Sequence, residues 1–456
     1  MDTQSMALSG NERKLMGTLC LLIIFGNINM TMFNLSIPSI SADFALTSSQ
    51  VSWVMVGYSI LMAIGAGTYG KLTESFSFRQ LYVIGLILLA FGSMIGFFST
   101  SYLQVITGRL LQAAGASSIS PLSYAAVTLY FKPTVKGRVL GTLSATIAFA
   151  SGFGPVFGGF VEQYFGWRAL FIVSSLSLFV IPLIFKYVPD KKHDRGSFDF
   201  LGAVLFSAGL ALVLLGVTNY WFMLIAGAAV LLWFGTHIQK KEHPFIDASF
   251  MKNAPYRRIL GIGFLTFVCN TGLTFTLPVM MKNSFHLPTS KIGLLMLPGA
   301  VCAALLGSRI GGWTDRFGSS RVLVISQSLV ISGFILLGVS VHLPPWIDAI
   351  LIIILMIGFN GVLTSSSNLV STTLRSAELG VGMGIFTLAY LLGGAFGPAL
   401  VGRLIDLKMP FFVVYFTISL LAILTYLFAR KQILAEAMVI SLVDLRHVRK
   451  IWRMNR

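Results

Sequence analysis

Few residues of this chain could hold a charge or pass a proton inside an otherwise apolar segment, and Arg109 is the clearest of them. It lies in the apolar stretch 103–129 and is followed by Gln112 and Gly115. An arginine about two helical turns deep in a bilayer is costly unless it meets a polar partner or a water-filled cavity. Arg109 is therefore predicted to contribute to a substrate or proton pathway. Snorkelling of its head group to the nearer membrane surface is the alternative.

Neutral polar side chains in the other apolar segments could complete such a pathway. We predict that they line a pocket together with Phe and Met side chains, which would suit an amphipathic organic molecule better than a sugar or a dicarboxylate. For each residue the alternative is a hydrogen bond between two helices. The candidates are Asn29, Asn34, Tyr58, Gln112, Asn270, Asn360 and Tyr390.

Carboxylates are absent where proton exchange would most need them. All 16 Asp and Glu residues fall at predicted helix ends or in loops. A buried carboxylate is the usual group that gains and loses a proton in a carrier. Coupling through an acid at a helix end, such as Asp199 or Glu162, remains open, and so does transport without proton coupling.

Catalytic and metal chemistry have no candidate residues. The three cysteines, Cys20, Cys269 and Cys302, have no disulfide or metal-ligand spacing, and no nucleophile lies beside a base in the apolar segments. We therefore expect no enzymatic activity, no metal and no cofactor.

Membrane-spanning helices must position these residues. The chain of 456 residues is 55% hydrophobic and 11% charged, with a mean hydropathy of +0.83, unlike soluble globular proteins. An apolar run of roughly 20 residues crosses a bilayer as a helix. Fourteen such runs predict an all-α membrane protein: residues 15–40, 51–70, 81–98, 103–129, 139–160, 169–188, 200–217, 221–238, 259–280, 292–313, 322–341, 346–370, 381–404 and 410–429.

The positive charge follows this topology. A net charge of +17 would suggest nucleic acid as the partner of a soluble protein. Here most Lys and Arg residues fall in the loops on the side that holds both ends of the chain. This positive-inside bias predicts that both termini are cytoplasmic, and we expect no nucleic-acid partner.

An internal repeat divides the helices into two halves. The stretch 70–74 after the second predicted helix is echoed by 311–315 after the tenth, and Gly-Pro at 154–155 by Gly-Pro at 397–398, at nearly equal separations. Two related halves are the architecture of alternating-access carriers. We predict a six-helix half (1–188), two linker helices with flanking cytoplasmic loops (189–258), a second six-helix half (259–430) and a basic cytoplasmic tail (431–456).

Two glycine-containing motifs accompany the repeat. The fifth predicted helix carries small residues that permit close helix packing, and a proline that bends it: Gly152, Gly154, Pro155, Gly158 and Gly159. The repeated loops place an acid at a cytoplasmic helix end, where it could hold one conformation by pairing with an arginine or a helix N-terminus. This predicted latch comprises Gly70, Glu74, Arg79, Gly311, Asp315, Arg316 and Gly318. Generic packing and solvated loop charges are the alternatives.

At these motifs the chain resembles the major facilitator superfamily, and most closely its fourteen-span drug:proton antiporters, including the tetracycline and multidrug efflux proteins of Gram-positive bacteria. The resemblance extends to about residue 430. It implies alternating access, export from a bacterial plasma membrane, a proton-linked role for Arg109, and an antiporter motif at 152–159. However, Asn29 stands where many members carry Asp, and Gly393 and Gly394 where related carriers have Glu.

The sequence therefore predicts a monomeric exporter of drug-like molecules, of the tetracycline or multidrug-resistance type, with protons as the coupling ion. Three alternatives stay open. They are an uncoupled facilitator, a carrier of another metabolite, and a carrier-derived membrane sensor that binds a ligand without transporting it.

Overall fold

The computed structural model describes residues 9–73, 76–190, 199–218, 220–241, 250, 252–375 and 379–431. Within these residues the chain is helical and contains no strand. The helices of the first half are α1 (Gly10–Met32), η2 (Phe33–Ser36), α2 (Ile37–Asp43), α3 (Ser48–Leu72), α4 (Phe78–Phe97), α5 (Tyr102–Ala116), α6 (Ile119–Tyr130), α7 (Pro133–Phe165), α8 (Ala169–Ser175), η3 (Leu176–Val180) and α9 (Ile181–Tyr187).

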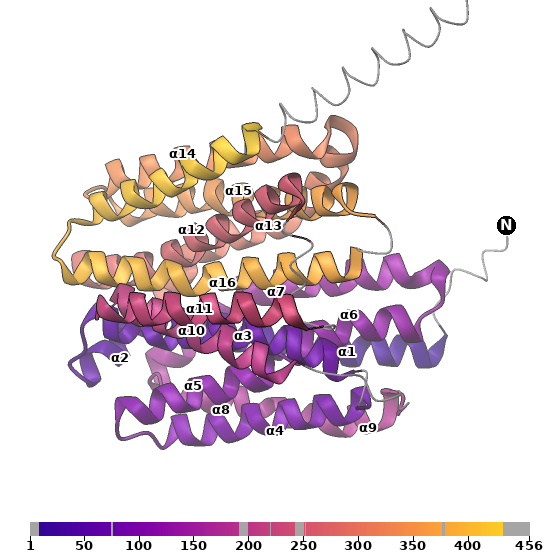
Figure 1. The fold of residues 1–456 in the computed structure, drawn as a ribbon. Coiled ribbons are helices and arrows are strands. Elements are labelled where there is room, and N and C mark those ends of the chain that lie inside the picture. Colours follow the sequence, from indigo (N-terminus) through magenta and orange to yellow (C-terminus); the bar gives the residue numbers. More distant parts are fainter. Residues whose placement is uncertain are drawn as a thin grey trace, which may run out of the picture.

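The linker and the second half follow. They comprise α10 (Phe200–Thr218), α11 (Phe222–Lys240), α12 (Ala254–Phe285), α13 (Thr289–Phe317), α14 (Ser319–Ser340), α15 (Pro345–Thr373), α16 (Leu379–Asp406) and a last helix, Phe411–Lys431. Figure 1 shows the helices running side by side, with α10 and α11 in front of α3 and beside α16. We call the end of the bundle where α1 begins the terminal face, and the opposite end the distal face.

The prediction of an all-α membrane fold is confirmed. Thirteen helices of the described chain are long and apolar enough to cross a bilayer. The remaining predicted span, 103–129, is divided into α5 and α6, each too short to cross alone. At this break the Ser117 and Ser118 hydroxyls donate to the carbonyls of Ala114 and Gly115, at 2.9 and 2.8 Å, and so compete with the helical backbone bonds.

Two other predicted spans contain a 3₁₀ turn between two α-helical parts. The first passes through the 3₁₀ turn η2 just before Pro38, and the sixth through η3 just before Pro182. A proline donates no backbone hydrogen bond to the preceding turn, so the helix tightens locally instead of continuing. Phe33 and Asn34 lie in this tightened turn, where the first span faces α12 and α13.

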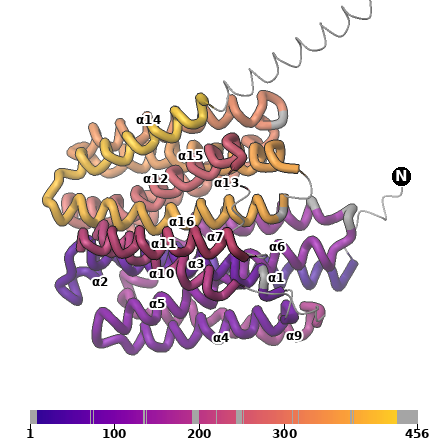
Figure 2. The backbone as a smooth tube through the Cα atoms, viewed as in Figure 1, coloured from indigo at the N-terminus to yellow at the C-terminus, as the bar shows by residue number. Residues whose placement is uncertain are grey.

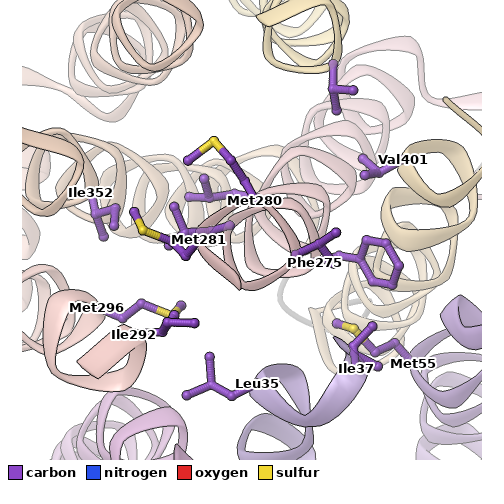
Figure 3. Close-up of a cluster of buried hydrophobic side chains, with 14 of the residues drawn as sticks. Leu35, Ile37, Met55, Phe275, Met280, Met281, Ile292, Met296, Ile352 and Val401 are labelled. Carbon is purple, nitrogen blue, oxygen red and sulfur yellow. The ribbon is translucent and has the colours of Figure 1, made fainter. Parts of the chain in front are cut away.

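Apolar side chains of both halves pack together near the distal face. Leu35, Ile37 and Met55 come from the first half and meet Phe275 and Met280, among others, from the second (Figure 3). The linker helices add a separate cluster, in which Leu210 and Leu214 of α10 pack between α3 and α16. The chain trace in Figure 2 follows the same order, with α16 between the upper helices of the second half and the lower helices of the first.

Candidate functional site

The guanidinium group of Arg109 lies between two aromatic rings inside the first half. Its Cζ is 4.1 Å from the ring centroid of Phe33 and 4.1 Å from that of Tyr58. The side chain is 1% exposed, so it does not snorkel to the surface. Ring faces attract a cation, and the attraction strengthens when water is excluded. η2 and α3 thus provide an apolar clamp that stabilises the positive charge.

Neutral hydrogen bonds complete the environment of Arg109. Its Nη1 donates to Gln112 Oε1 at 2.9 Å and to Asn29 Oδ1 at 3.3 Å. Gln112 Nε2 in turn donates to Ser93 Oγ at 2.8 Å, and Asn29 Nδ2 donates to Ser174 Oγ at 2.6 Å. The resulting network joins α1, α4, α5 and α8 around one buried charge. It is held by oriented dipoles in a medium of low dielectric constant.

Two polar atoms in this cluster have no hydrogen-bond partner. They are Arg109 Nε and the Tyr58 hydroxyl, and both are buried. A buried donor without a partner costs free energy, and such groups in native proteins often accompany function. The cluster is therefore the strongest candidate site in the described chain.

Glycines allow α4 and α5 to come close enough to build the network. A Cβ on Gly92 would lie 2.6 Å from Gly108 O, and a Cβ on Gly108 would lie 2.7 Å from Gly92 O. Only residues without a side chain permit this approach. It brings Ser93 of α4 against Gln112 of α5.

No carboxylate in the part of the chain that the structure describes pairs with Arg109. The ion pairs that we find among the described residues are Arg79–Asp190 at 3.7 Å, Arg168–Asp43 at 3.3 Å and His237–Asp199 at 2.8 Å. Asp199 also accepts a hydrogen bond from Gly202 N at 3.0 Å, at the start of α10. Asn29 Oδ1 thus supplies an amide dipole next to the guanidinium instead of a negative charge.

The predicted pathway residues fall into two groups. Asn29, Tyr58, Arg109 and Gln112 form the cluster just described, and Asn34 is buried one residue beyond Phe33. The residues of the second half lie on other helices and are not part of the cluster. Asn360 donates to Ala303 O at 3.2 Å, Tyr390 stacks on Phe267 at 4.0 Å, and Asn270 is half-buried on α12.

Sequence reasoning missed three members of the cluster. Phe33 follows Asn29 by four residues and so shares its helical face, a spacing that could have indicated it. Ser93 and Ser174 lie on helices whose sequences give no such indication, because their partners are distant along the chain.

The glycine motif on α7 permits close contact with two neighbouring helices, one in each half. A Cβ on Gly154 would lie 1.9 Å from Thr31 Oγ1, and one on Gly158 would lie 2.5 Å from Met32 O, both in the first half. A Cβ on Gly152 would lie 2.4 Å from the Ala300 Cβ, and one on Gly159 2.7 Å from Thr289 O, both in the second half. α7 therefore packs closely against α1 on one face and against α13 on another.

A partly buried polar cluster joins the halves at the distal face. Lys282 Nζ of α12 donates to Ser39 Oγ at 2.7 Å, and Ser39 donates to Glu162 Oε1 at 2.5 Å. Glu162 is buried, and its Oε2 and the nearby Ser36 Oγ have no hydrogen-bond partner of good geometry. A lysine of one half and a carboxylate of the other thus share one hydroxyl.

A second connection between the halves lies at the start of α3. The backbone N–H groups of Ser48 and Ser49 donate to the Asp406 carboxylate, at 2.7 and 2.9 Å. A carboxylate at a helix N-terminus satisfies unpaired donors and interacts favourably with the helix dipole. The last turn of α16 therefore caps the first turn of α3 across the interface.

The terminal-face ends of the same helices are less closely packed. Gly141 of α7 and Gly311 of α13 have no foreign atom within 4 Å of the place where a Cβ would stand, and the same holds for Gly70 and Gly384. The hydrogen bonds described between the halves lie at the distal ends. In this structure the halves are joined distally.

The predicted latch at the terminal face is only partly described. Glu74 lies outside the described residues, and Asp315 is in the last turn of α13. Arg79 donates to Val188 O at 3.0 Å and pairs with Asp190, within its own half. Arg316 lies over the Phe317 ring, and Gly318 ends α13 at φ +87°. The latch between the halves stays a prediction.

The chain resembles known membrane carriers. It matches the family described as Major Facilitator Superfamily over residues 18–238 and 259–437. It is 25% identical over 319 residues to riboflavin transporter RibZ of Clostridioides difficile (strain 630), covering 68% of this chain and 70% of that protein. It is 24% identical over 447 residues to a multidrug resistance protein B homolog of Mycobacterium tuberculosis (strain ATCC 25618 / H37Rv), covering 93% of this chain and 78% of that protein.

Two solved structures share the fold. The human organic anion transporter MFSD10 (TETRAN) aligns with a TM-score of 0.63 at 16% identity, over 92% of this chain and 100% of that one. A D-xylose-proton symporter aligns with a TM-score of 0.68 at 14% identity, over 91% of this chain and 97% of that one.

Proposed function

This chain belongs to the Major Facilitator Superfamily, and we propose that it exports drug-like organic molecules across a bacterial plasma membrane by alternating access. Transport as a general function follows from the family. The observation that carries the finer proposal is the seam between the halves, which is bonded at the distal face and loosely packed at the terminal face. Such a seam fits a carrier that opens toward one side at a time.

The direction of export rests on the orientation of the chain. The loops at the terminal face include Lys132, Lys136, Arg138, Arg257 and Arg258, whereas the distal face has fewer basic residues. We therefore assign the terminal face to the cytoplasm. The loosely packed end of the seam then faces the cytoplasm, from which a drug would be collected. Multi-pass insertion in the plasma membrane with both termini cytoplasmic, and a monomeric state, belong to this proposal.

The kind of substrate is supported by the neutral polar groups and by the relatives. Asn34, Asn270 and Asn360 offer hydrogen bonds among many Phe and Met side chains, as in pockets for amphipathic molecules. Among the relatives are proteins named for multidrug resistance and for riboflavin transport. Riboflavin is an organic molecule with a flat aromatic part. Tetracycline belongs to the same chemical class and is included in the proposal.

Protons are the proposed coupling ion. Glu162 is the carboxylate that we favour, because it is buried at the junction of the halves with one oxygen that lacks a hydrogen-bond partner. When the halves separate distally, Lys282 moves away and Glu162 becomes accessible to water. A carboxylate whose surroundings change in this way can bind a proton on one side of the membrane.

A second candidate function is facilitated export without proton coupling. Among the described residues Arg109 has no carboxylate partner, which favours this function, because the usual buried acid is replaced by the amide of Asn29. A ligand-binding sensor that does not transport would contain the same clusters. The two candidates and the antiporter differ only in flux and in its dependence on the pH gradient.

Reconstituted vesicles distinguish these functions. Vesicles containing the purified protein and loaded with tetracycline or riboflavin are given an inward or outward pH gradient, and efflux is followed by fluorescence. We expect efflux above that of empty vesicles, accelerated by a pH gradient and slowed when a protonophore collapses it. An efflux rate that does not depend on the pH gradient would support the facilitator. Saturable binding without efflux would support the sensor and overturn the transport proposal.

A further inference from the structure

Arg109 carries a positive charge that no described side chain near it neutralises. The groups that touch its guanidinium are two ring faces and two amide oxygens, from Phe33, Tyr58, Asn29 and Gln112. They lower the energy of the cation but leave its net charge unchanged. The positive potential therefore extends beyond the cluster into its surroundings.

The other buried charges of the described chain, Glu162, Asp199 and Asp348, do not cancel this potential. Asp199 lies at the start of α10 with His237 Nε2 2.8 Å from its Oδ1. Glu162 is matched by Lys282 through Ser39. Asp348 is buried in the first turn of α15, where it accepts a hydrogen bond from Ser340 Oγ at 2.9 Å. α15 packs on helices of the second half and is separated from α5 by the seam.

Arg109 is close enough to the seam to act on a molecule there. Its clamp residues come from η2, which meets α12 and α13, and from α3, which packs on α16. A molecule held in the seam is therefore separated from α5 by one layer of helix, which is about 10 Å. At that distance, with an effective dielectric constant of about 20, a unit charge changes a binding constant roughly 10- to 20-fold.

We propose that Arg109 sets the charge selectivity of the carrier, so that the transported molecules are organic anions, or neutral molecules of similar shape, and organic cations are disfavoured. The inference rests on the transport function proposed above and specifies its substrate class. Asn29 is the residue that permits this selectivity, because its Oδ1 lies 3.3 Å from Nη1. An aspartate at this position would place a carboxylate against the guanidinium and cancel the potential.

The test compares three flat probes that differ in charge: fluorescein as the anion, riboflavin as the neutral molecule and rhodamine 123 as the cation. Initial uptake is measured in vesicles whose membrane potential is held at zero with potassium and valinomycin. We expect fluorescein to be carried at least tenfold faster than rhodamine 123 at equal concentration. In Asn29→Asp and, independently, in Gln112→Glu, this ratio should fall about tenfold.

Matched variants separate charge from shape. Gln327→Glu makes the same exchange of an amide for a carboxylate in the second half, on α14, where Gln327 Nε2 donates to Thr266 Oγ1 at 3.1 Å. It lies away from the cluster and should lower the ratio less than Asn29→Asp does. In binding of the three probes to the purified protein, Arg109→Gln should remove the preference, whereas Arg109→Lys should keep part of it. Circular dichroism and thermal unfolding of each purified variant identify any that fail to fold.

The outcomes distinguish this inference from the transport proposal. Equal or faster transport of rhodamine 123 by the unaltered chain, or an unchanged ratio in both Asn29→Asp and Gln112→Glu, overturns the charge selectivity and leaves transport standing. If no probe is transported, binding of the three probes to the purified protein is compared. Tighter binding of fluorescein than of rhodamine 123 then supports the charge selectivity even though transport is not observed. Equal binding of the three probes, or no binding, contradicts it.

Discussion

Lys282, on α12 of the second half, donates a hydrogen bond from its ammonium group to Ser39, on α2 of the first half, at 2.7 Å. The Ser39 hydroxyl in turn donates a hydrogen bond to the Glu162 carboxylate on α7. Three helices from two halves thus meet at one half-buried hydroxyl. Separation of the halves at the distal face must break this contact and return two charged groups to water.

Removal of the lysine should loosen the distal face. In Lys282→Met the aliphatic packing is kept, but Glu162 is left buried without its cation, which costs more than the loss of an exposed ion pair. A single cysteine at Ser36, which is buried, reports the change in a chain whose native cysteines are replaced. We expect a membrane-impermeant maleimide to label it several-fold faster in Lys282→Met.

The matched control is Lys291→Met. Lys291 lies at the same face but is exposed, and no hydrogen bond to the first half is found for it. It should leave the labelling rate unchanged. Equal labelling in all three proteins would show that the Lys282 contact does not hold the distal face closed.

Asp406 should stabilise the closed contact between the halves at the distal face independently of Lys282. Asp406→Ala removes the cap from Ser48 N and Ser49 N, and loss of such a cap costs about 1 kcal/mol, or roughly fivefold in a conformational equilibrium. The same cysteine label measures it. Asp43→Ala is the control, because Asp43 bonds to Trp167 and Arg168 within the first half. A larger effect for Asp43→Ala than for Asp406→Ala would contradict this role.

Substitutions on the two faces of the α7 glycine motif should have different effects, one on transport and the other on thermal stability. Gly152→Ala places a methyl group 2.4 Å from the Ala300 Cβ across the seam, so it should slow transport severely while each half stays folded. The double variant Gly152→Ala with Ala300→Gly should recover most of the rate. Gly154→Ala instead meets Thr31 inside the first half and should lower the melting temperature by several degrees. Transport assays and thermal unfolding of the purified variants provide the comparison, and a lack of rescue would count against the seam contact.

Loss of Arg109 should abolish transport without preventing membrane insertion. Arg109→Ala leaves Asn29 and Gln112 without their shared donor and opens space between the Phe33 and Tyr58 rings, so the melting temperature should also fall. Membrane yield and efflux rate are measured together. Near-normal efflux would remove Arg109 from the transport pathway.

Much of the fold could be predicted because bilayer thickness fixes the length of an apolar helix. The helix breaks could not, since the division at Ser117 and Ser118 depends on side chains that bond to their own backbone. Those hydroxyls also face glycines: a Cβ on Gly65 would lie 2.0 Å from Ser117 Oγ. Such matches between distant helices leave no periodic pattern in one sequence.

The site was predictable where rare residue types stand in an apolar helix. Arg109, Asn29 and Gln112 were recognised in this way, and the structure brings them together. Contacts between the halves were not, because Ser39 and Lys282 are ordinary helix-end residues separated by 243 positions. The proposed latch around Glu74 illustrates the opposite case, in which a motif suggests a role that the described residues do not test.

The central claim is that the two halves separate at the distal face during every transport cycle. In a chain without native cysteines, Ser39→Cys and Lys282→Cys are joined by a short, reducible bifunctional thiol reagent, and efflux is measured from vesicles before and after reduction. We predict that cross-linking reduces efflux to the level of empty vesicles and that reduction restores it, while either cysteine alone has no such effect. Undiminished efflux through the fully cross-linked protein would contradict the claim.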